Sequence, residues 1–275
     1  MDCKQFFEQI KGKKIAMCGI GVSNTPLIKN FLGKGAYVYA CDRRSRAQIG
    51  IIADELEAAG AELRLGDGYL DNLEVDIIFR TPGMNFNLPE LEAARKKGIA
   101  VTSEMEVFFD LCPATIFAVT GSDGKTTTTT LIAKMLEAEG KNVYLGGNIG
   151  KPLLPEIEKI TADDFVVAEL SSFQLISMRK SPDVAVVTNV APNHLDIHKD
   201  MDEYVEAKKN ILLHQNAFSR TVLNRDNEIT RGFRKYVRGQ ALSFSMETPL
   251  KNGAWYDTDG YIHMAYRGID APIMH

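Results

Sequence analysis

A glycine turn followed by one lysine and five threonines is the stretch of this sequence best suited to chemistry. In "AVTGSDGKTTTTT" an apolar run ends at Gly121, and an amphipathic stretch follows at about residues 126–139. Glycines let a backbone wrap an anion, the amides of a helix start face it, and lysine adds a positive charge. A hydroxyl directly after the lysine is placed to hold Mg²⁺. The motif therefore predicts a phosphate-binding loop that contacts a nucleotide through Gly121, Ser122, Asp123, Gly124, Lys125, Thr126 and Thr127.

This loop departs from the full G-x-x-x-x-G-K-[ST] pattern, because Val119 stands where the first glycine would be. The alternative is a plain strand–turn–helix in which the threonines cap the helix. Threonine is a mediocre helix former, so helix propensity alone does not explain the run. We expect Thr126 and Thr127 to face phosphate and metal, and residues 128–130 to pack or to continue the helix.

A second glycine turn, "GIGVSN", follows the first apolar strand at residues 19–24, and Asp42 ends the next strand. The arrangement resembles the dinucleotide-binding fingerprint, in which an acid binds the ribose hydroxyls. Its third glycine is missing, because Asn24 stands in that place. A structural tight turn, an NAD site and a site for another nucleotide all remain open.

Further polar residues come at the ends of later strands. Glu169 ends an apolar strand at the sheet edge where ligands bind, which suits a Mg²⁺ ligand beside the phosphate loop. The stretch "TNVAPNHLDIH" offers His194, Asp196 and His198, of which His194 follows its strand soonest. Lys208 and Lys209 lie on a predicted helix. The alternatives are a solvated acid, structural histidines and surface lysines, and nothing in the pattern distinguishes the two lysines.

The elements that must position these residues alternate between strand and helix. Strands are predicted at "KKIAMCG", "AYVYACD", "DIIFR" and "IAVTSE", with helices ending in glycine at "NTPLIKNFLGKG", "QIGIIADELEAAG" and "LPELEAARKKG". A second series has strands at "TIFAVTG", "NVYLGG", "DFVVAELS", "DVAVVTNV" and "RTVLN". Such alternation indicates βαβ units and parallel sheets.

The tail of the chain differs in kind. "ALSFS" and "AWYDTDGYIHMAY" are predicted to be antiparallel strands, the second pair turning at Asp259-Gly260. The proline in "LCPAT" marks a boundary between the two series. The predicted fold is therefore α/β, with a Rossmann-like parallel-sheet domain at residues 1–112. A P-loop-type α/β ATPase domain follows at residues 113–275, with a small antiparallel β extension.

Composition narrows the class of protein. The chain has 275 residues, 45% of them hydrophobic and 25% charged, as in soluble globular proteins. A net charge of −4 gives no electrostatic footprint for nucleic acid or a membrane surface. Signal-peptide and transmembrane patterns are absent, and the four cysteines contain no C-x-x-C pair. We expect a reduced, soluble, cytoplasmic protein.

Together these motifs resemble the Mur ligases, the ATP-dependent amino-acid-adding enzymes of peptidoglycan synthesis. The matching stretches lie at about residues 14–225: "GIGVSN", "TPGMNFNLPELEAARKKGIAVTSEMEVF", "VTGSDGKTTT", "GGNIGKPLL", "AELSSFQL", "NHLDIH" and "YVEAKKNIL". "AELSSFQL" and the block beginning "TPG" are most similar to the D-glutamate-adding members of the family. The phosphate loop alone would also fit other Mur ligases or the related folylpolyglutamate synthases.

The resemblance implies roles by position. The first sheet would bind the UDP part of UDP-MurNAc-L-Ala rather than a nicotinamide, through Gly21, Val22, Ser23, Asp42, Arg43 and Gly83. Lys125 would bind the β- and γ-phosphates of ATP, and Thr126 with Glu169 would hold Mg²⁺. The remaining contacts to substrate or to a second metal ion would come from Asn148, Ser171 and His194.

In this family a lysine at the place of Lys208 is carbamylated, which turns a cation into a carboxylate metal ligand. Spacing from His194 and Tyr204 selects Lys208 rather than Lys209. Carbamylation needs a neutral amine, so the surroundings should lower the pKa of this lysine. The resemblance thus makes Lys125, His194 and Lys208 the candidate catalytic residues.

The reaction implied is phosphorylation of the L-alanyl carboxylate by ATP, followed by attack of the D-glutamate amine on the acyl phosphate. Two residues depart from the family pattern. Asp123 stands where the family more often has Asn or His, and Asn193 stands where it often has Asp. Family members also have a third, C-terminal domain. We expect this chain to be a monomeric fragment that lacks it, binds ligands and turns over weakly or not at all. An NAD-binding oxidoreductase and a non-catalytic nucleotide-binding module are the alternatives.

Overall fold

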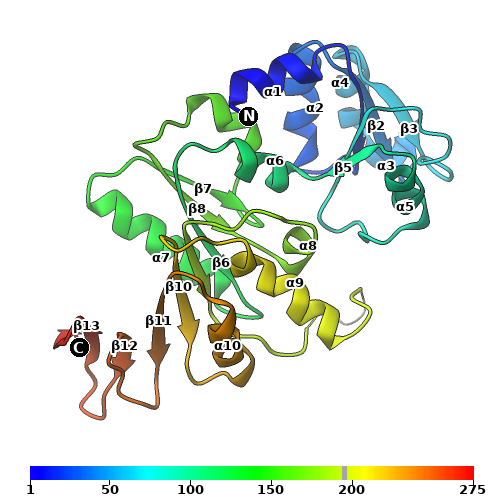
Figure 1. The fold of residues 1–275 in the computed structure, drawn as a ribbon. Coiled ribbons are helices and arrows are strands. Elements are labelled where there is room, and N and C mark those ends of the chain that lie inside the picture. Colours follow the sequence, from blue (N-terminus) through cyan, green and yellow to red (C-terminus); the bar gives the residue numbers. More distant parts are fainter. Residues whose placement is uncertain (194–196) are drawn as a thin grey trace. The chain divides into compact units, whose positions relative to one another are not determined.

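The computed structural model describes residues 1–193 and 197–275 and has an α/β fold (Figure 1). Two compact units can be distinguished. Unit 1 comprises Met1–Pro113 together with Gly150–Ala162, and unit 2 comprises Ala114–Ile149 together with Asp163–His275. A segment from the second half of the chain therefore packs into the first unit.

Unit 1 contains a five-stranded sheet in the order β3-β2-β1-β4-β5, and all neighbouring strands are parallel. This result confirms the predicted parallel sheet. β3 was not predicted, because its sequence "ELRL" is half polar and lacks a fully buried residue. The strands are β1 (Lys14–Cys18), β2 (Tyr37–Asp42), β3 (Glu62–Leu65), β4 (Ile77–Arg80) and β5 (Ala100–Thr102).

Six α-helices and one 3-10 helix accompany this sheet among the described residues. The helix predicted over "QIGIIADELEAAG" is broken at Gly50, whose φ of 67° is left-handed and ends one helix before the next begins. The helices are α1 (Cys3–Ile10), α2 (Asn24–Gly33), α3 (Arg46–Ile49), α4 (Ile51–Ala58), α5 (Pro89–Lys96), α6 (Glu104–Leu111) and η1 (Leu154–Lys159).

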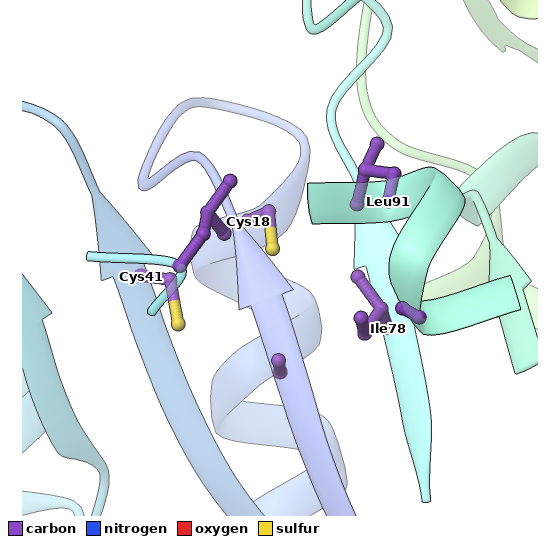
Figure 2. Close-up of a cluster of buried hydrophobic side chains, with 7 residues drawn as sticks. Cys18, Cys41, Ile78 and Leu91 are labelled. Carbon is purple, nitrogen blue, oxygen red and sulfur yellow. The ribbon is translucent and has the colours of Figure 1, made fainter. Parts of the chain in front are cut away.

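Alternation along the strands gives the sheet of unit 1 two apolar faces. Figure 2 shows one of them, where Cys18, Cys41 and Ile78 of three strands lie near Leu91 of α5. On another part of the sheet Phe79 meets Phe31 of α2, with ring centroids 5.1 Å apart. Cys18 and Cys41 are free and buried, so they pack as small apolar core residues.

Unit 2 contains a nine-stranded sheet in the order β14-β13-β12-β11-β10-β9-β6-β8-β7. Its strands are parallel from β7 to β12, and β12, β13 and β14 are antiparallel. They are β6 (Thr115–Thr120), β7 (Val143–Gly147), β8 (Phe165–Glu169), β9 (Val184–Val187), β10 (Arg220–Asn224), β11 (Gln240–Ser245), β12 (Gly253–Tyr256), β13 (Ile262–Tyr266) and β14 (Ile269–Met274).

The prediction for the tail is right for one hairpin and wrong for one strand. The turn at Asp259-Gly260 does join antiparallel β12 and β13. However, β11, the predicted antiparallel "ALSFS", pairs in parallel with both β10 and β12. The parallel pairing with β10 follows from a helical crossover between β10 and β11, which returns the chain in the same direction and which the sequence interpretation missed.

The helices of unit 2 start from the strand ends that carry the candidate site. α7 packs on β6, β7 and β8, whereas α9 packs on β6 and α8 (Figure 1). The helices are α7 (Lys125–Ala138), α8 (Ser172–Leu175), α9 (Met201–Leu213), α10 (Glu228–Gly232) and η2 (Phe233–Tyr236). Among the described residues, none of the helices combines the length and apolarity needed to cross a bilayer.

Candidate functional site

The phosphate loop joins β6 to α7 in the parallel part of the unit 2 sheet, where β6 lies between β8 and β9. A Cβ atom at Gly121 would lie 1.9 Å from the Thr188 hydroxyl, so only glycine fits there. Gly124 has a φ of 76° and is the N-cap of α7, where no side chain of the described residues makes a capping hydrogen bond. The alternative that the threonines cap this helix is therefore wrong.

Residues that follow β9 hold the loop in shape. The backbone N–H of Asp123 donates to the side-chain oxygen of Asn189 at 2.9 Å, and the Thr188 hydroxyl donates to the Asp123 carbonyl at 2.6 Å. The Ser122 hydroxyl donates to the Ala191 carbonyl at 2.8 Å. These contacts come from an adjacent strand end, so the sequence motif alone could not reveal them.

Past the loop, the first turn of α7 presents polar groups in different directions. Helix-internal bonding begins with Thr128, which leaves the three preceding amides of the helix start without helical acceptors. The Lys125 ammonium donates to the Ser122 carbonyl at 2.9 Å. Thr127 is exposed, whereas Thr129 is buried and donates to the Lys125 carbonyl at 2.8 Å.

Glu169 places a carboxylate beside the loop. It ends β8 with only 1% of its surface exposed, and its two oxygens accept from the Thr126 hydroxyl at 2.7 Å and the Asn148 amide at 2.8 Å. Gly147 brings the neighbouring strand close, because a Cβ there would lie 2.2 Å from the Glu169 carbonyl oxygen. The carboxylate and hydroxyl oxygens form the kind of hard donor set that Mg²⁺ prefers.

Lys208 reaches the same loop from α9 on the other side. Its ammonium donates to the Gly121 carbonyl at 2.8 Å, lies 4.7 Å from the centroid of the Tyr204 ring, and belongs to a side chain 1% exposed. Burial, and to a lesser extent the charge of Lys125, lowers the pKa of Lys208 to about 7. An amine with this pKa is about half neutral at pH 7, as carbamylation requires.

The structure also separates two lysines that the pattern left equivalent. Lys209 pairs with Glu206 and lies over the Tyr236 ring, away from the contacts that Lys208 makes with the phosphate loop. The spacing from Tyr204 that the resemblance used is four residues on a helix, which places Tyr204 and Lys208 on one face of α9.

Of the other residues predicted near this site, some lie outside the described residues and others make structural hydrogen bonds. His194 and Asp196 lie outside the described residues. His198 is buried and its ring is hydrogen-bonded to Ser172 and Glu203. Ser171 is the N-cap of α8, where its hydroxyl accepts from the Gln174 backbone N–H. The S-x-x-Q spacing in "SSFQ" is a capping-box signal that could have predicted this role.

In unit 1 the second glycine turn is held mainly by Gly19. It has a φ of 96°, and a Cβ there would lie 2.7 Å from the Thr81 side chain, so this position requires glycine. Gly21 and Gly83 have no described heavy atom within 4 Å of such a Cβ, apart from their chain neighbours. Val22 is 80% exposed. The surface of this turn is therefore open, as a ligand contact would require.

Asp42 is engaged within its own unit. Its carboxylate accepts from the backbone N–H of Ile20 at 2.8 Å and from a guanidinium fork of Arg44 at 2.8 and 3.0 Å. Burial alone would raise the pKa of Asp42, but these hydrogen bonds outweigh it and lower the pKa. Arg43, the arginine singled out from sequence, is exposed. Since the Asp42 oxygens are already paired, a ribose-binding role of the NAD type is disfavoured.

A metal ion at this site would need ligands from the nucleotide and water as well as from the protein. Within the described part of the chain, no three His, Cys, Asp or Glu side chains lie close enough to hold a metal on their own. Glu169 and Thr126 can supply two oxygen ligands, and nucleotide phosphates and water would have to supply others. The site therefore suits a Mg²⁺–nucleotide pair better than a free metal ion.

Comparison with known proteins agrees with this geometry. The Mur ligase middle domain matches residues 119–270, and the chain belongs to the Mur ligase family. It is 55% identical over 255 residues to the UDP-N-acetylmuramoylalanine–D-glutamate ligase of Acetivibrio thermocellus, covering 92% of this chain and 55% of that protein. The ligase of the same name from Clostridium botulinum is 48% identical, with 98% and 58% covered. The chain thus spans little more than half the length of these relatives.

Solved structures show the same fold at low sequence identity. The UDP-N-acetylmuramate:L-alanyl-gamma-D-glutamyl-meso-diaminopimelate ligase of Neisseria meningitides matches with a TM-score of 0.60 at 19% identity, over 94% of this chain and 86% of that one. The murein peptide ligase of Psychrobacter arcticus matches with a TM-score of 0.56 at 16% identity, over 96% and 61%. The predicted α/β architecture is confirmed.

Proposed function

We propose that this chain provides the substrate- and nucleotide-binding part of an ATP-dependent ligase that joins D-glutamate to UDP-N-acetylmuramoyl-L-alanine. The observation that carries the proposal is the meeting of two lysines and a buried carboxylate at one glycine loop. Lys125 and Lys208 each donate to a loop carbonyl, and Glu169 accepts from the hydroxyl of Thr126. The names of the relatives at 48–55% identity support the choice of substrates.

Each group at the loop has a distinct part in this proposal. The Lys125 ammonium, now on the Ser122 carbonyl, would exchange that acceptor for the β- and γ-phosphates. Thr126 and Glu169 would hold Mg²⁺, which when bound neutralises triphosphate charge. Asn148 orients the Glu169 carboxylate through one of its oxygens. Catalysis of this kind consists mainly of positioning and charge neutralisation.

Lys208 would act as a carbamate in the working site. Its neutral amine, available because burial lowers the pKa to about 7, would add to the carbon of CO₂ and release a proton. The carbamate would supply a further oxygen ligand facing the phosphate loop, with His194 as a neighbouring ligand. The lowered pKa and the contact with the Gly121 carbonyl support this role over that of Lys209.

Residues 1–112 would bind the UDP-sugar, and residues 113–275 the nucleotide. The open surface formed by Gly21, Val22, Ser23, Arg43 and Gly83 supports binding of the UDP part there. The L-alanyl carboxylate would take the γ-phosphoryl group of ATP, and the D-glutamate amine would displace phosphate as the amide forms. The protein would act in the cytoplasm as a monomer, in peptidoglycan synthesis and hence in cell shape and division.

Calorimetric titration of the 275-residue chain tests the proposal. UDP-MurNAc-L-Ala, Mg²⁺–ATP and NADH would be titrated in parallel, with saturable binding of the first two on the order of micromolar, or about −8 kcal/mol. Binding of NADH alone would favour a dehydrogenase instead. Binding of ATP without the UDP-sugar would favour a non-catalytic nucleotide-binding module. Light scattering after size-exclusion chromatography would test the monomer.

A further inference from the structure

We propose that His198 is a positioning residue that holds the ring of Tyr204, and through it Lys208, against the phosphate loop. The inference deepens the proposed function, because that function uses Lys208. The pattern of the sequence offered His198 only as one of two histidines in "NHLDIH". In the structure it forms a buried link between α8 and α9, two helices that pack against each other.

Hydrogen bonds fix the imidazole of His198 at both nitrogens. Nε2 lies 2.8 Å from the Ser172 hydroxyl, and Nδ1 lies 3.1 Å from a Glu203 carboxylate oxygen. Since a carboxylate only accepts, Nδ1 carries the proton in the neutral ring and Nε2 accepts from Ser172. The ring also stacks on Phe173, with centroids 4.9 Å apart and planes 5° apart. The imidazole therefore has one well-defined orientation.

This fixed ring also contacts the ring of Tyr204. Their centroids are 5.3 Å apart at 67°, an edge-to-face arrangement that favours one ring position. Tyr204 is 1% exposed, its hydroxyl lies 3.0 Å from the Ser122 hydroxyl, and its face lies 4.7 Å from the Lys208 ammonium. Tyr204 thus contacts both the loop and Lys208, and His198 packs against its ring.

The two hydrogen-bond partners of His198 lie close in sequence to residues of the candidate site. Ser172 begins α8 only three residues after Glu169, and Glu203 directly precedes Tyr204 on α9. By joining these two residues, His198 ties the strand end that carries Glu169 to the helix that carries Lys208. Loss of the imidazole would leave a cavity beside Tyr204 and would remove two hydrogen bonds between buried or half-buried groups.

Chemical labelling at one fixed pH tests the inference. The intact chain would be treated with acetic anhydride, and acetylation of Lys208 would be measured by mass spectrometry relative to Lys209. We expect His198→Ala to raise the relative labelling of Lys208 by about tenfold, because local opening of a buried segment exposes its side chains. His198→Phe keeps a ring against Phe173 and Tyr204, so it should restore most of the protection.

A control variant and two milder variants accompany the labelling of His198→Ala. His214→Ala changes an exposed histidine at the end of the same helix and should leave labelling unchanged. If His198→Ala does not fold, Ser172→Ala and Tyr204→Phe remove single hydrogen bonds and should each raise Lys208 labelling by a smaller factor. Unchanged labelling of Lys208 in every folded variant would overturn the inference. ATP binding by the unmodified chain reports separately on the proposed function, so the two failures are distinguishable.

Discussion

The two glycine turns of this chain follow strands in similar positions but differ in how their charged groups are paired. Each turn follows an interior strand with parallel neighbours on both sides, β6 in one unit and β1 in the other, and each contains a glycine position that has no room for a Cβ. At the phosphate loop, Glu169 is held by a hydroxyl and an amide. At the other turn, Asp42 is held by the guanidinium of Arg44 and a backbone N–H.

The partners of the two carboxylates show which of them is available to bind a cationic ligand. A neutral hydroxyl and an amide leave the charge of Glu169 uncompensated, so a cation can be bound there without breaking an ion pair. Asp42, in contrast, is already neutralised within its own unit. A carboxylate at the end of a strand is thus a candidate ligand only when its partners are neutral. Four measurements test this difference between the two turns.

Substitution of the glycines is expected to have the largest effect. Gly121→Ala places a Cβ 1.9 Å from the Thr188 hydroxyl, whereas Gly21→Ala meets no described atom within 4 Å beyond its chain neighbours. Relief of such overlap costs about 3 kcal/mol, which corresponds to at least about 100-fold weaker binding of ADP. Calorimetry with ADP would measure this loss, and Gly21→Ala should bind normally. Equal affinity of both variants would contradict the assignment of the loop.

The buried lysine predicts a pH-dependent stability. The pKa of Lys208 is about 7 in the folded state, below its usual 10.5, so between these pH values the unfolded chain binds a proton that the folded chain lacks. Stability should therefore rise with pH across this window, by up to about 1.4 kcal/mol per pH unit. Lys208→Met should remove this slope in urea unfolding, with Lys209→Met as the matched variant. Parallel curves for wild type and Lys208→Met would contradict the burial argument.

Removal of one charge at the phosphate loop tests metal ligation. Glu169→Gln keeps the size of the side chain and an acceptor for Thr126 or Asn148, but loses the carboxylate. The gain in ATP affinity on adding Mg²⁺ should fall about 10- to 100-fold. Titrations with and without Mg²⁺ would measure it, and Glu139→Gln at the exposed end of α7 serves as control. An unchanged Mg²⁺ dependence would exclude Glu169 as a ligand.

Substitution of the adjacent Arg43 and Arg44 in unit 1 should have the smallest effects, one on ligand binding and the other on stability. Arg44→Ala leaves the buried Asp42 without its fork, at a cost in unfolding free energy of about 1–3 kcal/mol. Arg43→Ala should change stability by no more than about 0.5 kcal/mol while weakening UDP-MurNAc-L-Ala binding. Thermal unfolding and calorimetry of the two variants separate structure from binding. A reversal of the two results would mean that Arg44 is the ligand contact.

Much of the fold could be predicted from local patterns, and the exceptions have physical causes. Strands of four to six apolar residues are recognisable because they are buried, as in β8 and β9. β3 was missed because it is half exposed and polar, and the direction of β11 was wrong because a crossover was not recognised. The polarity of β3 hides this strand from an apolar pattern, whereas the direction of β11 is not encoded within the strand itself.

The phosphate loop could be predicted from the sequence alone, because the backbone conformations that only glycine permits and a lysine beside a helix start are local properties. The sequence also determined the alternation of strands and helices, since burial on one face sets the spacing of apolar residues. The residue pattern left Lys208 and Lys209 equivalent, and the family resemblance favoured Lys208; the three-dimensional structure shows that Lys208 contacts the loop and that Arg44 rather than Arg43 pairs with Asp42. Neighbours in sequence differ there by the direction of a side chain, and that direction is set by packing against distant strands.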